Sequence, residues 1–120
     1  MIKQGNISKN SEKYKNWFLG PFIVEEDFNT KNSRNFEAKW SKREAGYFHL
    51  LKENIVNDES CSSMAICVYG EFQYSFLEDD GTYKDYPLVK EGDFVFWTPD
   101  INHKVKVIKD SLFITIRWYK

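Results

Sequence analysis

Short runs of alternating apolar and polar residues, separated by turn signals, occupy the chain from Phe36 onward. This alternation is the pattern of half-buried β-strands. The predicted strands fall in the ranges 36–41, 47–51, 64–69, 71–77, 86–89, 94–97, 103–109 and 112–119. About eight short strands at this spacing are typical of a β-sandwich or barrel. No window keeps apolar residues at a helical period, so only a short helix near the N-terminus is expected.

Polar segments between these runs carry turn chemistry. Glu78–Thr82 contains Asp-Gly, a dipeptide that supplies the positive φ of a tight hairpin turn. Further turns are expected at Lys90–Asp93 and Lys109–Ser111. The turns and the alternating runs together predict an all-β, antiparallel fold.

The N-terminal third differs from the rest of the chain. Residues 1–16 are polar and predict a loosely held arm, with an edge strand swapped onto a partner as the alternative. Trp17–Val24 then concentrates large apolar side chains around a Gly-Pro turn, and we expect them to cover one end of the sheet core. Residues 25–35 are polar and predict a loop. We therefore divide one structural domain into an N-terminal arm and covering segment, residues 1–35, and a barrel, residues 36–120.

Length and charge exclude several classes of protein. A chain of 120 residues forms one domain and can bury a core without disulfide or metal support. Its 17 basic and 18 acidic side chains give a net charge of −1, which lacks the basic excess of a nucleic-acid-binding protein. No apolar run is long enough to span a bilayer, and the start lacks a secretory signal. We expect a cytoplasmic protein with neither nucleic acid nor membrane as a partner.

The run GDFVFWTPDINH resembles the second conserved motif of the cupin superfamily. Upstream, Val68–Phe72 is similar to the end of the first cupin motif, so the resemblance covers residues 38–118. It implies a small antiparallel β-barrel or jelly roll of the RmlC-like cupin type. Two positions depart from the second motif, Ile101 in place of a glycine and Val107 in place of an asparagine. The matching positions are Gly92, Asp93, Pro99 and His103.

The resemblance also implies a divalent metal held by two histidines and a glutamate of the first motif together with His103. This chain has no His-x-His between Gly46 and Gly70, and Lys52 and Asn54 stand at the corresponding positions. An ammonium has no lone pair, and an amide is a weak ligand for a transition metal. We therefore expect no complete histidine metal site and no cofactor. A divalent ion on non-standard ligands stays as the alternative, with His103, Glu37 and Asp58 as candidate ligands.

Candidate chemistry centres on His103, which the resemblance places at the barrel mouth. An imidazole there is suited to act as an acid, a base or a hydrogen-bond donor near neutral pH. The equally weighted structural interpretation is a rim histidine without a chemical role. Tyr74 or Lys39 would polarise a carbonyl beside it if the protein is a catalyst. Trp97, with Tyr74, is a candidate for stacking on a flat ligand such as a sugar ring.

Two strands carry charged residues on one of their faces. Glu37, Lys39 and Ser41 alternate with Phe36, Ala38 and Trp40, and Thr115, Arg117 and Tyr119 alternate with Ile114, Ile116 and Trp118. If the polar sets point inward, Glu37 and Lys39 line a pocket with His103, and Arg117 indicates a carboxylate or phosphate ligand. If they point outward, they form a solvated face, which is the more common outcome. A shift of one residue in register decides between the two.

These observations predict a cupin-like protein that binds a small polar ligand, with a sugar as one candidate, in the barrel. The first alternative is a metal-independent isomerase, epimerase or lyase that uses His103 as acid or base. The second is a metal-dependent cupin enzyme with non-standard ligands. Binding ranks above catalysis because spacing assigns no second catalytic group beside His103. The resemblance further implies a homodimer, and the aromatic residues of Trp17–Val24 would suit its interface.

Overall fold

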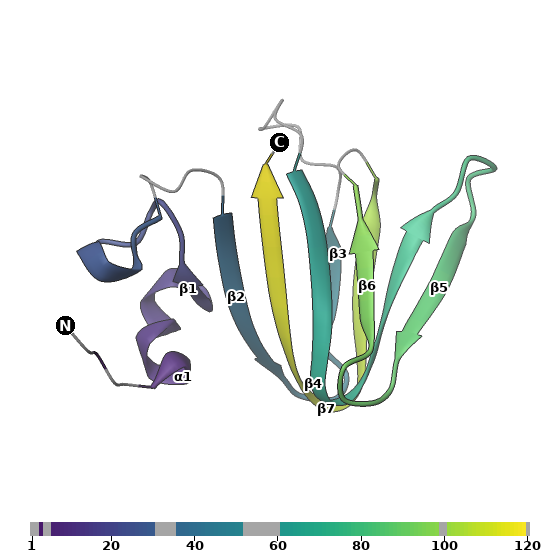
Figure 1. Cartoon of the computed structure of the whole chain (residues 1–120). Helices are drawn as coiled ribbons and strands as arrows, with labels where there is room; N and C mark the ends of the chain where they lie inside the picture. The colour runs from purple at the N-terminus through teal and green to yellow at the C-terminus, as the bar shows by residue number, and fades with distance from the viewer. Residues whose placement is uncertain (1–2, 4–5, 31–35, 52–60, 99–100, 120) are drawn as a thin grey trace.

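The computed structural model describes residues 3, 6–30, 36–51, 61–98 and 101–119. Seven strands in this part of the chain form one antiparallel sheet that folds over on itself (Figure 1). They are β1 (Trp17–Leu19), β2 (Phe36–Arg43), β3 (Phe48–Leu51), β4 (Cys61–Leu77), β5 (Tyr83–Leu88), β6 (Phe94–Trp97) and β7 (His103–Tyr119). The prediction of an all-β fold is confirmed.

Strand order follows from the pairing of two long central strands. The main path is β1-β2-β7-β4-β5, with β3 paired to β7 and β6 paired to β4. β4 and β7 pair along their lengths, from Cys61 opposite Tyr119 to Phe76 opposite His103. Every other strand except β1 is therefore anchored directly on β4 or β7.

β4 and β7 are each 17 residues long, where the sequence pattern predicted two short strands in each range. Their pairing register shifts between Cys67 and Phe72, and bulges of this kind bend a strand without ending it. Gly70 lies in this bend with φ of 103°, and a Cβ there would lie 2.3 Å from Ser111 Oγ and 2.5 Å from the Asp110 backbone oxygen. The turn predicted at Lys109–Ser111 is thus wrong, because this segment is the bent middle of β7.

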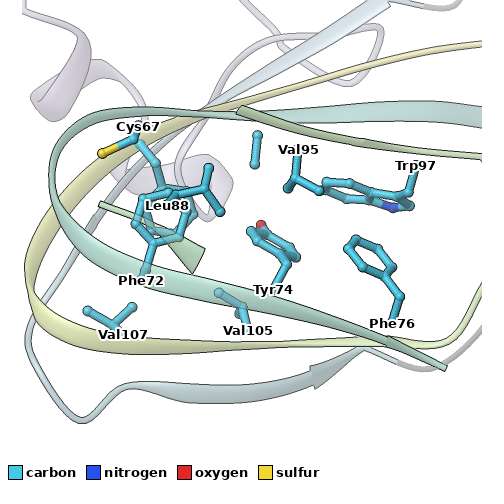
Figure 2. Packing of buried hydrophobic residues seen from close by; sticks show 11 residues of the cluster. Cys67, Phe72, Tyr74, Phe76, Leu88, Val95, Trp97, Val105 and Val107 are labelled. Atoms are coloured by element: carbon cyan, nitrogen blue, oxygen red, sulfur yellow. The ribbon is translucent and has the colours of Figure 1, made fainter. Parts of the chain in front are cut away.

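The bend divides the sheet into two walls. The β2 wall comprises β1, β2, β6 and residues 61–67 of β4 with 111–119 of β7, and the β3 wall comprises β3, β5 and residues 72–77 of β4 with 103–107 of β7. Phe113 of the β2 wall stacks on Phe72 of the β3 wall with ring centroids 4.3 Å apart. Figure 2 shows buried residues of the core between the two walls. Its buried members are Ala65, Cys67, Phe72, Tyr74, Phe76, Leu88, Val95, Trp97, Val105, Val107 and Phe113.

The N-terminal segment lies beside β2 at one edge of the sheet (Figure 1). It contains α1 (Ile7–Asn10), the 3₁₀ turns η1 (Glu12–Tyr14) and η2 (Glu26–Phe28), and β1, which pairs with β2. Ile23 is buried, whereas Phe22 is 43% and Val24 83% exposed. The segment thus extends the sheet, and its apolar residues are less covered than the sequence pattern suggested. No helix in the described part of the chain has the length and apolar character to cross a membrane.

The hairpin turn predicted at 78–82 and the turn predicted at 90–93 are both confirmed. The backbone N–H of Glu78 donates to the oxygen of Thr82 at 2.7 Å, and Gly81 takes a φ of 86°. The carboxylate of Asp93 accepts hydrogen bonds from the backbone N–H groups of Val89 and Lys90 at 3.0 and 3.1 Å. These local bonds close β4 on β5 and lead the chain into β6.

Candidate functional site

The polar side chains of β2 point into the fold. Directly opposed residues of an antiparallel pair project from the same face of a sheet. Ser41 pairs with Phe113, which lies in the core, and Glu37 and Lys39 share the face of Ser41. Glu37 and Ser41 are only 4% and 2% exposed. The interpretation of this polar set as a solvated face, the more common outcome for such strands, is therefore wrong for this chain.

Arg117 faces inward from β7 and forms an ion pair with Glu37. Its Nε and Nη2 atoms lie 2.7 and 2.5 Å from the same carboxylate oxygen, Oε2. The Glu37 side chain is 5% exposed and that of Arg117 32%. The Trp17 ring covers the guanidinium, with its centroid 4.4 Å from Cζ. The anion that an inward Arg117 requires is thus supplied by the chain itself.

Lys39 is half-buried between other cations. Its Nζ lies 5.5 Å from the centroid of the Trp17 ring, and none of the ion pairs in the described part of the chain includes it. Burial lowers the pKa of Lys39, and the positive charges of Arg43 and Arg117 lower it further. Arg43 lies on the same face, with its guanidinium 4.4 Å from the Tyr47 ring centroid. We call Lys39, Arg43 and Arg117 the cationic edge.

His103 lies among aromatic rings of the core. Its ring centroid is 5.0 Å from that of Trp97, 5.7 Å from that of Phe76 and 6.1 Å from that of Tyr74. Nδ1 is 3.1 Å from the backbone oxygen of Ile101, and because a carbonyl only accepts, Nδ1 carries the proton. Nε2 of the neutral ring therefore has the free lone pair.

Burial lowers the pKa of His103, the hydrogen bond to Ile101 raises it, and the charge of His49 lowers it again. The net shift is downward, so the neutral form with a basic Nε2 predominates near pH 7. Of the roles predicted for His103, the arrangement suits a base, and it also makes Nε2 a hydrogen-bond acceptor, a role that was not predicted.

Tyr74 and Trp97 are mainly core residues. They are 4% and 8% exposed, and their ring centroids lie 4.9 Å apart. Figure 2 shows both rings between the walls together with Phe76. Burial raises the pKa of Tyr74, although a side-chain hydrogen bond with Thr115 opposes the shift, so its phenol stays neutral. Little ring surface of either residue is open for stacking on a ligand.

Thr115 connects the predicted site residues. It lies opposite Lys39 in the pairing of β2 with β7 and forms the side-chain hydrogen bond with Tyr74, whose ring lies next to His103. Lys39, Tyr74 and His103, predicted as catalytic residues, thus lie on the inner sides of the two walls, which together we call the concave face. Sequence analysis missed Arg43, although it continues the two-residue period of Glu37, Lys39 and Ser41.

The described residues do not fit the metal site that the family resemblance implies. No group of three or more His, Cys, Asp or Glu side chains among them is arranged to hold a metal ion. The carboxylate of Glu37 is paired with Arg117. Asp58 lies outside the described residues.

A cavity of about 610 Å³ lies in the N-terminal segment, and the described residues that line it include none of the predicted site residues. Apolar side chains form much of its lining, among them Phe18, Leu19, Ile23 and Phe28. At its rim, Glu25 accepts hydrogen bonds from Lys13 at 2.5 Å and Tyr14 at 2.7 Å, which lower the pKa of Glu25 to about 2. These polar lining groups bind one another, and the sequence pattern did not predict the cavity.

No protein-family model matches the sequence, and no curated protein matches it. Two variants of oxalate decarboxylase from Bacillus subtilis match in structure, with TM-scores of 0.59 and 0.61 and identities of 11% and 12%. Each match covers 82% of this chain and 24% of the other, so the chain spans about a quarter of the length of that protein. KdgF from Halomonas sp. matches with a TM-score of 0.51 and 18% identity, over 72% of this chain and 70% of KdgF.

Both of these proteins are cupins, and the described sheet matches theirs. The chain therefore has a cupin fold, as its second-motif residues predicted. Identities of 11–18% carry no information on ligand or reaction, so these must be argued from the side chains of the concave face.

Proposed function

We propose that this protein binds a small polar ligand on the concave face of its cupin fold without a histidine-bound metal. The inward turn of charged and polar side chains from β2 and β7 is the observation that carries the proposal. Burying such groups is unfavourable unless they find polar partners. Glu37 has such a partner in Arg117, whereas Lys39 lies against the face of an indole and has no carboxylate partner among the described residues. A polar ligand would supply the missing partner.

His103 supports the same proposal from the opposite side. Its Nε2 lone pair can accept a hydrogen bond from a ligand hydroxyl or amide, and Nδ1 is held by the Ile101 carbonyl. The surrounding rings of Phe76, Tyr74 and Trp97 fix the imidazole in place. A ligand such as a sugar, with several hydroxyl groups, matches an acceptor on one wall and donors on the other.

Metal-independent catalysis is the second candidate function, because His103 is held in its basic form and Lys39 is a cation on the same face. Proton abstraction by Nε2 with a carbonyl polarised by Lys39 would give an isomerase, epimerase or lyase. Binding ranks first because the Tyr74 hydroxyl, the other group predicted to polarise a carbonyl, forms a hydrogen bond with Thr115. The metal-dependent alternative depends on ligands that the described residues do not supply.

Calorimetric titration with a panel of neutral sugars and polyols tests the proposal. We expect saturable binding that is weakened at least about tenfold in His103→Phe, which keeps an aromatic ring but removes Nε2. Phe48→Ala, at a side chain 56% exposed on β3, is the control and should bind like the wild type. Failure of the whole panel would contradict binding of neutral polar ligands. Turnover of a bound compound, lost in His103→Phe, would favour catalysis instead.

A further inference from the structure

Among the described residues, the charges of the concave face are not balanced. Lys39, Arg43 and Arg117 carry three positive charges, and the carboxylate that faces them, Glu37, binds Arg117 through one oxygen. In the described part of the chain, the ion pairs include neither Lys39 nor Arg43. Two half-buried cations therefore have no carboxylate partner among these residues.

Aromatic rings hold these two cations without neutralising them. Lys39 Nζ lies 5.5 Å from the Trp17 ring centroid, and the Arg43 guanidinium lies 4.4 Å from the Tyr47 ring centroid. A cation over a ring is attracted to its face but keeps its full charge. An ammonium and a guanidinium have several hydrogen-bond donors each. Both side chains therefore keep donors that no described carboxylate accepts.

We propose that the ligand of the concave face is an anion whose charged group binds Lys39 and Arg43. This inference rests on the proposed function, because it concerns the same face. Thr115 lies directly opposite Lys39 and forms a hydrogen bond with Tyr74. The Tyr74 ring in turn lies beside His103. The charged group would lie at the cationic edge, and the uncharged remainder of the ligand would extend toward Nε2 of His103.

An anion at this position also explains why a half-buried lysine is tolerated. Burial and two neighbouring cations disfavour the charged ammonium of Lys39 and so lower its pKa. A carboxylate or phosphate within about 4 Å would reverse that penalty and form charge-assisted hydrogen bonds. A neutral ligand would leave the repulsion between the three cations in place.

Three compounds with the same ring test the inference by calorimetric titration: glucose, glucuronate and glucose 6-phosphate. The wild type should bind at least one of the two anions about tenfold more tightly than glucose, and added salt should weaken only the anion. Lys39→Met, which keeps most of the aliphatic stem, should reduce the affinity for that anion to the level of glucose. Lys42→Met, on the exposed outward side of the same strand, should leave it unchanged.

The outcomes separate this inference from the proposed function. Glucose binding as tightly as both anions would overturn the anion site and leave a site for neutral ligands. Anion binding that survives in Lys39→Met would overturn the role of Lys39. If none of the three compounds binds, the anion inference is overturned for sugar anions. The titrations with neutral sugars and polyols test the proposed function separately. If Lys39→Met fails to fold, Lys39→Gln is the second variant and carries the same expectations.

A different observation concerns the outer face of the β2 wall, which is apolar. Phe94, Phe96 and Phe36 are 62%, 44% and 36% exposed on it, and Phe96 stacks on Trp118 at 6.0 Å between ring centroids. Pairing register places further apolar side chains on the same face. They are Trp40, Met64, Ile66, Ile114, Ile116 and Trp118. An antiparallel sheet with a solvated outer face would carry polar residues at these positions.

We infer that a second copy of this chain covers this face. Lys42 also lies on the outward side of β2, but beyond Trp40 and opposite Leu112, next to the bend. The apolar patch itself can therefore meet its copy across a two-fold axis without like-charge repulsion. With about 200 Å² for a fully exposed aromatic side chain, the patch exposes on the order of 500 Å². A stable interface buries roughly 800 Å² per partner, so this patch would supply most of it. The face differs from Trp17–Val24, the segment expected for a homodimer, because Trp17 packs on Lys39 and Arg117.

Light scattering on a sizing column measures the mass in solution. The wild type at about 100 µM should have twice the chain mass of 14.3 kDa. Phe94→Glu should have the mass of one chain, whereas Phe48→Glu, at an exposed position on β3, should stay dimeric. A monomeric wild type, or a dimer that persists in both Phe94→Glu and Phe96→Lys, would overturn the inference. Circular dichroism checks that each variant is folded.

Discussion

Glu37 of β2 and Arg117 of β7 lie directly opposite each other inside the fold and form a hydrogen-bonded ion pair, with Arg117 Nε 2.7 Å from Glu37 Oε2. The pair ties the strand that follows the N-terminal segment to the last strand of the chain. A slip of one residue between β2 and β7 would move one of the two charges to the apolar outer face. The pair therefore stabilises one register against its neighbours.

Removing either partner of this pair should have unequal effects. Arg117→Met removes the guanidinium that binds Glu37, whose side chain is 5% exposed, and should cost about 3 kcal/mol or more of unfolding free energy. Glu37→Gln should cost less, because Arg117 is 32% exposed and still reaches water. The double variant should cost less than the sum of the two. Urea unfolding measures all three, and additive effects would show that the pair is not coupled.

Gly70 should tolerate no side chain, in contrast to another glycine of positive φ. In Gly70→Ala the new Cβ would meet Ser111 Oγ at 2.3 Å and backbone atoms at 2.5 Å, so β7 must move, at a cost of about 3 kcal/mol or more. Gly81→Ala is the matched control, with φ of 86° but no atom within 4 Å, and should cost about 1 kcal/mol. Equal losses of unfolding free energy in Gly70→Ala and Gly81→Ala, measured by chemical denaturation, would contradict the close approach of Gly70 to Ser111 at the bend.

Stability should depend on pH through His103. Its pKa in the folded state is lowered from 6.5, chiefly by burial, so the unfolded chain binds the proton more tightly. The contribution of the neutral imidazole is complete above pH 6.5 and is lost as the pH falls below it. When the pH is lowered from above 6.5 to below it, the unfolding free energy of His103→Gln should therefore fall less than that of the wild type. An identical decline in both proteins would show that other groups control it.

Metal content provides a test of the departure from the first cupin motif. Protein incubated with manganese, iron, nickel or zinc and then desalted should retain only trace metal by elemental mass spectrometry, because the described residues offer no ligand group of three. The metal content of His103→Ala should equal that of the wild type. Near-stoichiometric metal that is lost in His103→Ala would instead support the metal-dependent alternative, with ligands outside the described residues.

The local sequence determined those parts of the fold that depend on neighbouring residues. Asp-Gly at 80–81 and the Gly92-Asp93 turn form as predicted, because positive φ and a carboxylate that accepts nearby backbone N–H groups act over a few residues. The pattern of apolar and polar residues also located β2, β3, β5 and β6 and the two arms of β4 and of β7, but not β1. The motif ending at His103 predicted the cupin fold that the solved structures confirm.

Only the tertiary structure decided which face of each strand is inside. Alternation places Glu37 and Lys39 on one side and Phe36 and Trp40 on the other, but it does not say which side meets the opposite wall. That choice depends on contacts between distant segments, such as Phe72 with Phe113 and Thr115 with Tyr74. The partner of Arg117 lies 80 residues away, and the contact of Gly70 with Ser111 turns two predicted pairs of strands into two long, bent ones. The free energy of these choices is collective, so no local pattern of residues reveals it.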